Sequence, residues 1–237
     1  ITFFKFFYKV IFFRNFFMHK SVQNLVNIQS SIKSKLVKLK YENRIPKIIA
    51  VSKTFKLDHI LPAINHGHIH YGENKVQEAV EKWTQIKKQK ENIKLHLIGR
   101  LQSNKVKQAI KLFDYIHSLD SKKLADKIFK FQNELNVKPK LFIQVNIGDE
   151  EQKSGISKDE VLDFYKYCSS LDLDVIGLMC IPPFDKDSKK YFKEMNDLNK
   201  IIKLNELSMG MSSDYLDAIE NQATFLRIGS SIFGQRA

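Results

Sequence analysis

Short apolar runs typical of β-strands alternate with amphipathic, helix-type segments along almost the whole chain after Met18. Strands that alternate with helices pair in parallel through βαβ units, so this pattern predicts an α/β fold. The predicted strands cover residues 48–53, 68–71, 94–98, 115–118, 140–147, 174–179, 206–208 and 224–228. The predicted helices cover residues 19–40, 57–65, 74–88, a segment to 112 capped by Ser103 and Asn104, a segment to 135 capped by Asp120 or Ser121, 158–170, 187–203 and 214–220, before a closing turn through Phe233 and Gly234.

Eight strand-then-helix units in about 220 residues are the number for a (β/α)8 TIM barrel. We therefore predict a single barrel domain over residues 18–237. The alternative is a doubly wound open sheet, but its G-x-G-x-x-G fingerprint is absent from the start of the first helix. In a barrel the active site lies at the C-terminal ends of the strands, so polar residues there are the candidates for function.

Residues 1–17, ITFFKFFYKVIFFRNFF, have a different composition, with 8 of the 18 phenylalanines, three basic residues and no acid. This leader is too short for a standard transmembrane helix and lacks a signal-peptide cleavage site. It is compatible with an interfacial anchor or a targeting segment. We favour a third interpretation, in which the stretch is not native and Met18 is the true start.

The formal net charge of +13 raises the question of a nucleic-acid partner. The lysines are spread over many helices, and no basic run is interleaved with aromatic residues. We therefore expect a lysine-rich surface that favours a small anionic ligand, with neither nucleic acid nor membrane as a partner of residues 18–237. Cys168 and Cys180 have no metal or redox spacing, which favours a reduced, cytoplasmic compartment.

Lys53 ends the first predicted strand, where Ile49, Val51 and Lys53 share one face because side chains alternate. If that face points inward, Lys53 lies at the barrel mouth. Partial desolvation there lowers a lysine pKa, and a neutral amine forms a Schiff base with an aldehyde. A strand-terminal surface lysine is the alternative in a chain this rich in lysine.

The loops after the last two predicted strands contain Ser208, Gly229 and Ser230. These loops are the usual phosphate site of a barrel, and backbone N–H groups with serine hydroxyls suit a phosphate dianion. Ordinary turn chemistry is the alternative. Arg227 shares a strand face with Phe225, and a buried arginine needs an acceptor. The ring nitrogen of pyridoxal 5′-phosphate (PLP) is one candidate acceptor, and a structural carboxylate is the other.

Two further segments place polar groups near the barrel mouth: residues 71–74 after the second predicted strand, and residues 96–104, which span the third predicted strand and its loop. Asn74 ends the run Tyr71-Gly72-Glu73-Asn74 after the second predicted strand. The alternating His66, His68 and His70 suggest a metal, but no carboxylate or cysteine completes a ligand set. We therefore expect no metal site and expect packing to account for these histidines.

Taken together, the segments resemble the pyridoxal phosphate homeostasis proteins, relatives of the N-terminal barrel of alanine racemase. The matching motifs follow in order along nearly the whole chain after Met18. They are AVSKT (50–54), YGEN (71–74), QE (77–78), HLIG (96–99), LQ (101–102), NK (104–105), VNI (145–147), KSGI (153–156), GLM (177–179), IP (181–182), SMGMS (208–212), RIG (227–229) and IFG (232–234).

The resemblance implies that Lys53 holds PLP as a Schiff base, and that Ser208 and the amides of Gly229 and Ser230 hold its phosphate. It also implies that Arg227 faces the pyridine nitrogen and keeps it unprotonated, which weakens the ring as an electron sink. Two departures are Arg100 between Gly99 and Leu101, and Ser230 where threonine is common. Neither changes the expected site.

The resemblance also bears on catalysis. Alanine racemases add a β-rich domain with a catalytic tyrosine, and the chain has no room for it after the eighth predicted strand. Removal of a Cα proton needs a base on each face, and we find no second base opposite Lys53. We therefore expect a non-catalytic, monomeric PLP carrier that buffers PLP and supplies apo PLP-dependent enzymes. The alternative is a PLP-dependent amino-acid racemase.

Overall fold

A closed barrel of eight parallel strands, in sequence order, forms the centre of the molecule. The computed structural model describes residues 18–41 and 44–235, so the predicted leader, residues 1–17, lies outside the described residues. The strands are β1 Lys47–Val51, β2 His70–Glu73, β3 Lys94–Leu97, β4 Tyr115–Leu119, β5 Lys140–Val145, β6 Val175–Cys180, β7 Glu206–Ser208 and β8 Phe225–Ile228. β1 pairs with both β2 and β8, which closes the sheet. The TIM-barrel prediction is confirmed, and the open-sheet alternative is wrong.

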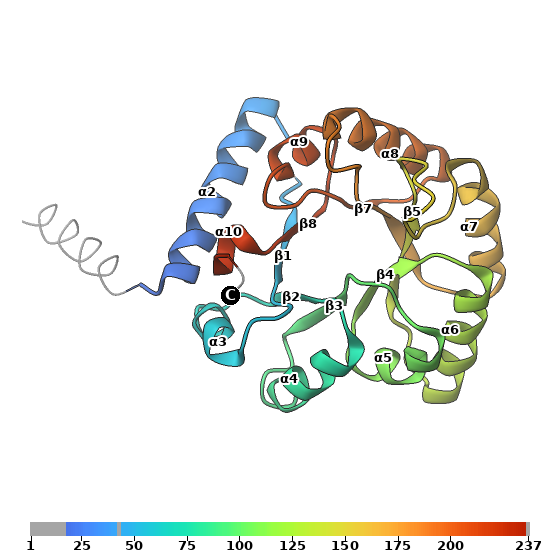
Figure 1. The fold of residues 1–237 in the computed structure, drawn as a ribbon, viewed down its shortest axis with the longest axis horizontal. Helices are drawn as coiled ribbons and strands as arrows, with labels where there is room; N and C mark the ends of the chain where they lie inside the picture. The colour runs from blue at the N-terminus through green and yellow to red at the C-terminus, as the bar shows by residue number, and fades with distance from the viewer. Residues whose placement is uncertain (1–17, 42–43, 236–237) are drawn as a thin grey trace, which may run out of the picture.

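Helices surround the strands in a ring (Figure 1). They are α2 Lys20–Leu39, α3 Leu57–Asn65, α4 Val76–Gln89, α5 Val106–Leu112, α6 Lys122–Leu135, α7 Val161–Ser170, α8 Ser188–Ile202, α9 Tyr215–Glu220 and α10 Ser230–Phe233, with short 3-10 turns η1 Ser103–Lys105 and η2 Lys158–Glu160. The first helix, α2, packs against α3, α9 and α10. It therefore covers the side of the barrel where the first and last strands meet.

Several predicted boundaries move. β2 begins at His70 rather than residue 68, because Gly67 adopts φ 97° and the chain needs two more residues to reach the sheet. Ser103 and Asn104 do not cap α5 but lie in η1, and the N-cap of α5, Lys105, makes no side-chain cap bond. Ser121 does cap α6, since its hydroxyl accepts from the backbone of Leu124.

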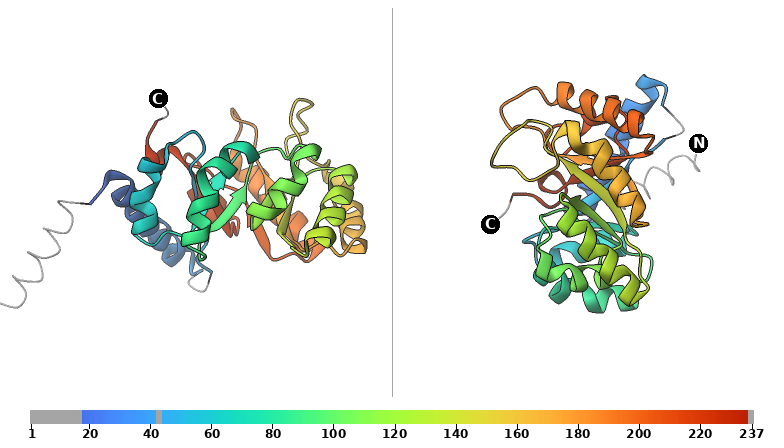
Figure 2. Two further views of the ribbon diagram at one scale, coloured as in Figure 1. Left: turned by 90° about the horizontal axis from the view of Figure 1, so that it is seen from below. Right: turned by 90° about the vertical axis from the view of Figure 1, so that its right-hand side faces the viewer.

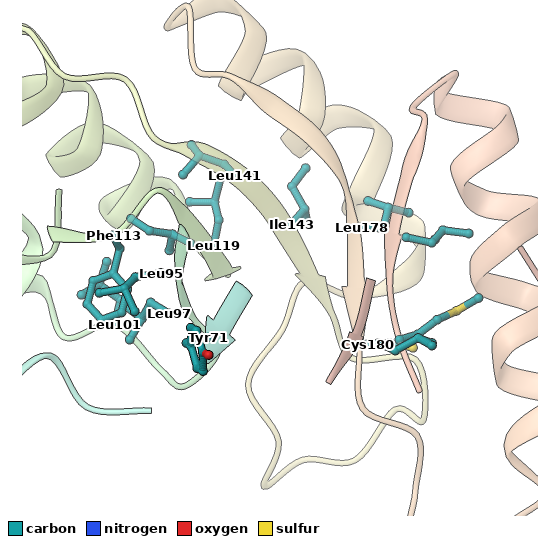
Figure 3. Packing of buried hydrophobic residues seen from close by; sticks show 14 of the residues in the cluster. Tyr71, Leu95, Leu97, Leu101, Phe113, Leu119, Leu141, Ile143, Leu178 and Cys180 are labelled. Carbon is teal, nitrogen blue, oxygen red and sulfur yellow. The ribbon is translucent and has the colours of Figure 1, made fainter. Parts of the chain in front are cut away.

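The strands have two buried faces, one toward the helices and one toward the barrel axis. Outward side chains join one large apolar cluster, and Figure 3 shows part of it, including Leu141 and Ile143 of β5 and Leu178 of β6. The inward apolar cluster is small and consists of Ile49, Phe142, Met179 and Phe225. The predicted alternation on β1 and β8 is confirmed, because Ile49 and Phe225 face inward.

The loops after β5 and β6 stand out on the same side of the barrel as the C-terminal end of the chain (Figure 2). This side carries the C-terminal ends of the strands, where barrel sites are found. Within residues 18–41 and 44–235, no helix is both long enough and apolar enough to cross a membrane.

Candidate functional site

A cavity of about 510 Å³ opens at the C-terminal end of the barrel. It brings together five of the six predicted site residues: Lys53, Asn74, Arg227, Gly229 and Ser230. They come from the ends of β1, β2 and β8, which lie side by side because β1 pairs with both neighbours. The remaining lining is Val51, Phe55, Ile98, Ile181, Met211, Ser212, Ser213, Gly234 and Gln235.

Lys53 lies in a turn two residues beyond the end of β1, not within the strand as predicted. The backbone on both sides of it is held by distant groups. The hydroxyl of Ser52 donates to Glu73 Oε1 at 2.7 Å, and its backbone N–H donates to the carbonyl of Gly72 at 3.0 Å. The N–H of Thr54, which has φ 68°, donates to Glu78 Oε1 at 2.7 Å. Lys53 is therefore presented by a turn with fixed flanks.

Lys82 on α4 connects these supports. Its ammonium donates to the Ser52 carbonyl at 2.9 Å, to Glu73 Oε1 at 2.9 Å and to Glu78 Oε1 at 3.0 Å. Glu73 is fully buried and also accepts from the indole N–H of Trp83 at 2.9 Å. Burial raises the pKa of Glu73, and Lys82 opposes that rise. We call Glu73, Glu78 and Lys82 the support triad of the Lys53 turn.

Asn74 lines the cavity next to Gly99, where any larger residue would force the backbone to move. A Cβ atom on Gly99 would lie 2.4 Å from the Asn74 carbonyl oxygen. The loop after β3 therefore passes directly over Asn74, and Ile98 in this loop lines the cavity. The HLIG motif thus contributes a close backbone contact as well as a lining side chain.

The turns after β7 and β8 form a second wall, next to the Lys53 turn because β8 pairs with β1. Gly210 has φ 88°, and Asp214 Oδ1 accepts from the N–H of Met211 at 2.6 Å. The hydroxyl of Ser212 accepts from the N–H of Ser231 at 3.3 Å, which joins the two turns. Ser212, Ser213 and Ser230 therefore bring three hydroxyl groups to one side of the cavity.

Arg227 is buried beneath this wall and faces inward, as predicted from its position two residues after Phe225. Its guanidinium donates to the carbonyl oxygen of Ser208 at 2.6 Å, to Ser208 Oγ at 2.8 Å and to the carbonyl oxygen of Cys180 at 2.7 Å. No carboxylate of the described residues pairs with it. The structural-carboxylate alternative is therefore wrong, and the observed acceptors are neutral.

Ser208 does not line the cavity, contrary to our expectation that it holds a phosphate. It is fully buried on the inward face of β7, where its hydroxyl lies between Arg227 and His117 Nδ1, 2.9 Å from the latter. β7 ends at Ser208, and the serines that follow it in the sequence and line the cavity are Ser212 and Ser213. The predicted loop is therefore at the site, but different serines reach the cavity.

The histidines are arranged differently from the expected alternation on one strand. Only His70 lies on β2, whereas His66 is the C-cap residue that follows α3, and the ring of His68 lies 2.9 Å from the His70 carbonyl oxygen. In the part of the chain that the structure describes, no group of three or more suitable side chains could hold a metal ion. His96, expected near the barrel mouth with its segment 96–104, lies buried inside the barrel, as does His117, for which no role was predicted.

Comparison with known proteins places the chain in a family. Residues 29–237 match the family described as alanine racemase, N-terminal domain. A pyridoxal phosphate homeostasis protein of Pasteurella multocida is 37% identical over 225 residues, which cover 90% of this chain and 97% of that protein. The chain belongs to the pyridoxal phosphate homeostasis proteins, within the alanine racemase N-terminal domain family. The resemblance inferred from the motifs is confirmed.

Solved structures agree with the family assignment. PipY of Synechococcus elongatus, solved with PLP bound, matches with a TM-score of 0.74 and 32% identity over 86% of this chain and 100% of that chain. An alanine racemase of Clostridium difficile matches with a TM-score of 0.69 over 91% of this chain and 56% of that chain. At 18% identity the racemase shows a common fold alone.

Proposed function

We propose that this protein binds PLP as a Schiff base on Lys53 and acts in PLP homeostasis, as a carrier that buffers and delivers the cofactor. The observation that supports this most directly is the cavity that joins Lys53, Arg227 and the serine-rich turns after β7 and β8. Its volume of about 510 Å³ lies in the range of small-molecule sites. PLP, with an aldehyde, a ring nitrogen and a phosphate, matches the three kinds of group in the cavity.

Each part of the cavity has a task in this proposal. The amine of Lys53 condenses with the aldehyde, and the support triad holds its turn in place. The hydroxyl groups of Ser212, Ser213 and Ser230, with the backbone at Gly229, bind the phosphate. Arg227 directs an N–H group at the pyridine nitrogen, so that this nitrogen accepts a hydrogen bond and stays unprotonated. Asn74 lines the same cavity as a polar contact.

A carrier fits the cavity better than a racemase. Among the described lining residues, Lys53 and Arg227 are the only titratable side chains. A racemase needs an acid–base group on each face of the substrate, and an arginine does not deprotonate in proteins. An arginine at the ring nitrogen also disfavours the protonated ring that serves as an electron sink. We therefore infer a non-catalytic role, with apo PLP-dependent enzymes as recipients.

The relatives support the same proposal. The Pasteurella protein is named a pyridoxal phosphate homeostasis protein, and PipY has been solved with PLP bound. Both are more than 30% identical to this chain. We also infer a cytoplasmic location, since Cys168 and Cys180 are buried and free, as in a reducing compartment. The expectation of a monomer stays a prediction from the sequence.

The test is an absorption spectrum of the purified protein with added PLP, followed by borohydride reduction and peptide mapping. We expect an imine band in the wild type and a pyridoxyl label on Lys53. Lys53→Ala removes both, whereas Lys56→Ala, an exposed lysine in the same loop, keeps both. A label on another lysine, or no band, refutes the site. A chiral assay then separates the two functions, because racemisation above the rate of free PLP refutes the carrier.

A further inference from the structure

Three histidines on consecutive strands form a hydrogen-bonded chain along the inside of the barrel. His70 Nδ1 lies 2.9 Å from His96 Nε2, and His96 Nδ1 lies 2.9 Å from His117 Nε2. His117 Nδ1 lies 2.9 Å from Ser208 Oγ, which accepts from Arg227 at 2.8 Å. The chain therefore runs from Arg227, at the cavity, to the half-buried His70 at the start of β2.

The two middle histidines are held by aromatic stacking and are fully buried. The ring of His96 stacks on Tyr115 at 4.2 Å, and the ring of His117 stacks on Phe142 at 4.3 Å. Burial holds the pKa of both imidazoles well below its usual range, and the positive charge of Arg227 lowers that of His117 further. Each ring is therefore neutral near pH 7, with one nitrogen that donates and one that accepts.

Arg227 sets the direction of this chain. A guanidinium only donates, so Ser208 Oγ must accept from it. The hydroxyl hydrogen of Ser208 then has one acceptor among the described residues, His117 Nδ1. With the opposite direction this hydrogen would be buried without a partner, which is unfavourable. His117 therefore donates from Nε2 to His96, and His96 donates from Nε2 to His70.

We propose that His117 and His96 are positioning residues that hold Arg227 in place. Arg227 in turn fixes all three histidines of the chain in the Nε2–H form. The chain draws the Ser208 hydroxyl hydrogen toward His117, so that a lone pair of its oxygen faces Arg227. The guanidinium is thereby anchored at one end and directs its remaining N–H groups toward the cavity. This inference rests on the proposed role of Arg227 in PLP binding.

The first test uses the wild-type protein without PLP, with ¹⁵N-labelled histidine. Nitrogen chemical shifts distinguish protonated from unprotonated ring nitrogens. We expect His70, His96 and His117 to carry hydrogen on Nε2 alone at pH 7, and the Nδ1 signal of His117 to shift in Ser208→Ala, which removes the hydroxyl that donates to this nitrogen. An Nδ1–H form or a charged ring at His96 or His117 in the wild type overturns the proposal, as does an unchanged signal of His117 in Ser208→Ala.

The second test asks whether the chain affects the ligand. His117→Phe keeps a ring against Phe142 but removes the hydrogen bond, whereas His117→Gln retains one acceptor and one donor. We expect the dissociation constant for PLP to rise about tenfold in His117→Phe, with a shift of the imine absorption maximum, and to recover in His117→Gln. His66→Phe, at an exposed histidine outside the chain, leaves both unchanged.

The two tests separate this inference from the proposed function. If wild-type protein forms no imine on Lys53, the proposed function fails, while the histidine signals still report the direction of the chain. If wild-type protein binds PLP and His117→Phe binds it equally with the same absorption maximum, the positioning role is refuted and the carrier function stands.

Discussion

Replacing Lys82 with methionine is expected to destabilise the barrel by an amount that depends on pH. Lys82 is the cation beside the buried Glu73 carboxylate, 2.9 Å away, and its own side chain is only 10% exposed. Methionine keeps the apolar stem and removes the charge. Breaking a buried ion pair by removal of one partner costs about 3–5 kcal/mol when the remaining charge stays buried.

The dependence on pH follows from Glu73. Burial already raises its pKa in the folded protein, and Lys82 opposes this rise. Without Lys82 the folded-state pKa rises further, while the unfolded chain keeps the ordinary value. Between these two values the folded state binds more protons than the unfolded state, so stability falls as pH rises. At low pH, uptake of a proton by Glu73 limits the loss.

We therefore expect the free energy of unfolding to fall by about 3 kcal/mol at pH 8. At pH 5 we expect a fall of about 1 kcal/mol, because only the hydrogen bond to the Ser52 carbonyl is then lost. Urea denaturation at the two pH values measures both. Lys166→Met is the control, because it breaks an exposed ion pair with Asp163 and should change nothing measurable. An equal loss at both pH values, or a greater loss at pH 5, would contradict the interpretation of Glu73.

Three further substitutions test other parts of the site. Gly99→Ala places a Cβ atom 2.4 Å from the Asn74 carbonyl oxygen. We expect the free energy of unfolding, measured by urea denaturation, to fall by about 2 kcal/mol and PLP binding to weaken. Unaltered stability would mean that this loop moves freely. Phe142→Ala opens a cavity on the barrel axis and should cost about 3–5 kcal/mol; a loss below 1 kcal/mol would show that the interior collapses around it. Arg227→Met removes charged hydrogen bonds to a ligand and should raise the dissociation constant for PLP about ten- to a hundredfold. Visible titration measures this constant, and an affinity equal to that of the wild type would contradict the role of Arg227.

The fold was predictable because strand and helix periodicities are local properties of the chain. The helices Lys20–Leu39 and Leu57–Asn65 begin and end within a residue of the prediction. The start of β2 was predicted two residues early because alternating histidines imitate a strand. What decides that boundary is the left-handed backbone of Gly67, which the residue type permits without requiring it.

The candidate site was predictable only where a side chain lies close in sequence to a strand end. Lys53, Asn74, Gly229 and Ser230 meet this condition and line the cavity. Ser208 meets it too but points inward, and three residues of β7 are too few for alternation to reveal this.

Other contributions depend on contacts between distant segments. Glu73 and Lys82 lie 21 and 30 residues along the sequence from Ser52, so no local pattern identifies them as supports of Lys53. His96 and His117 did leave a signal, since each is a polar residue inside an otherwise buried strand. A buried polar residue needs a partner, and that requirement pointed to the barrel interior.

The division of the strands into two buried faces has a consequence for how such a protein can change over time. Most apolar burial lies between the strands and the ring of helices, whereas the inward apolar cluster comprises only Ile49, Phe142, Met179 and Phe225. The outer shell therefore supplies most of the folding stability. Substitutions on the axis can then accumulate as matched pairs of donors and acceptors while the shell keeps the fold intact. The interior of such a barrel can therefore change to suit a new ligand while the fold is kept.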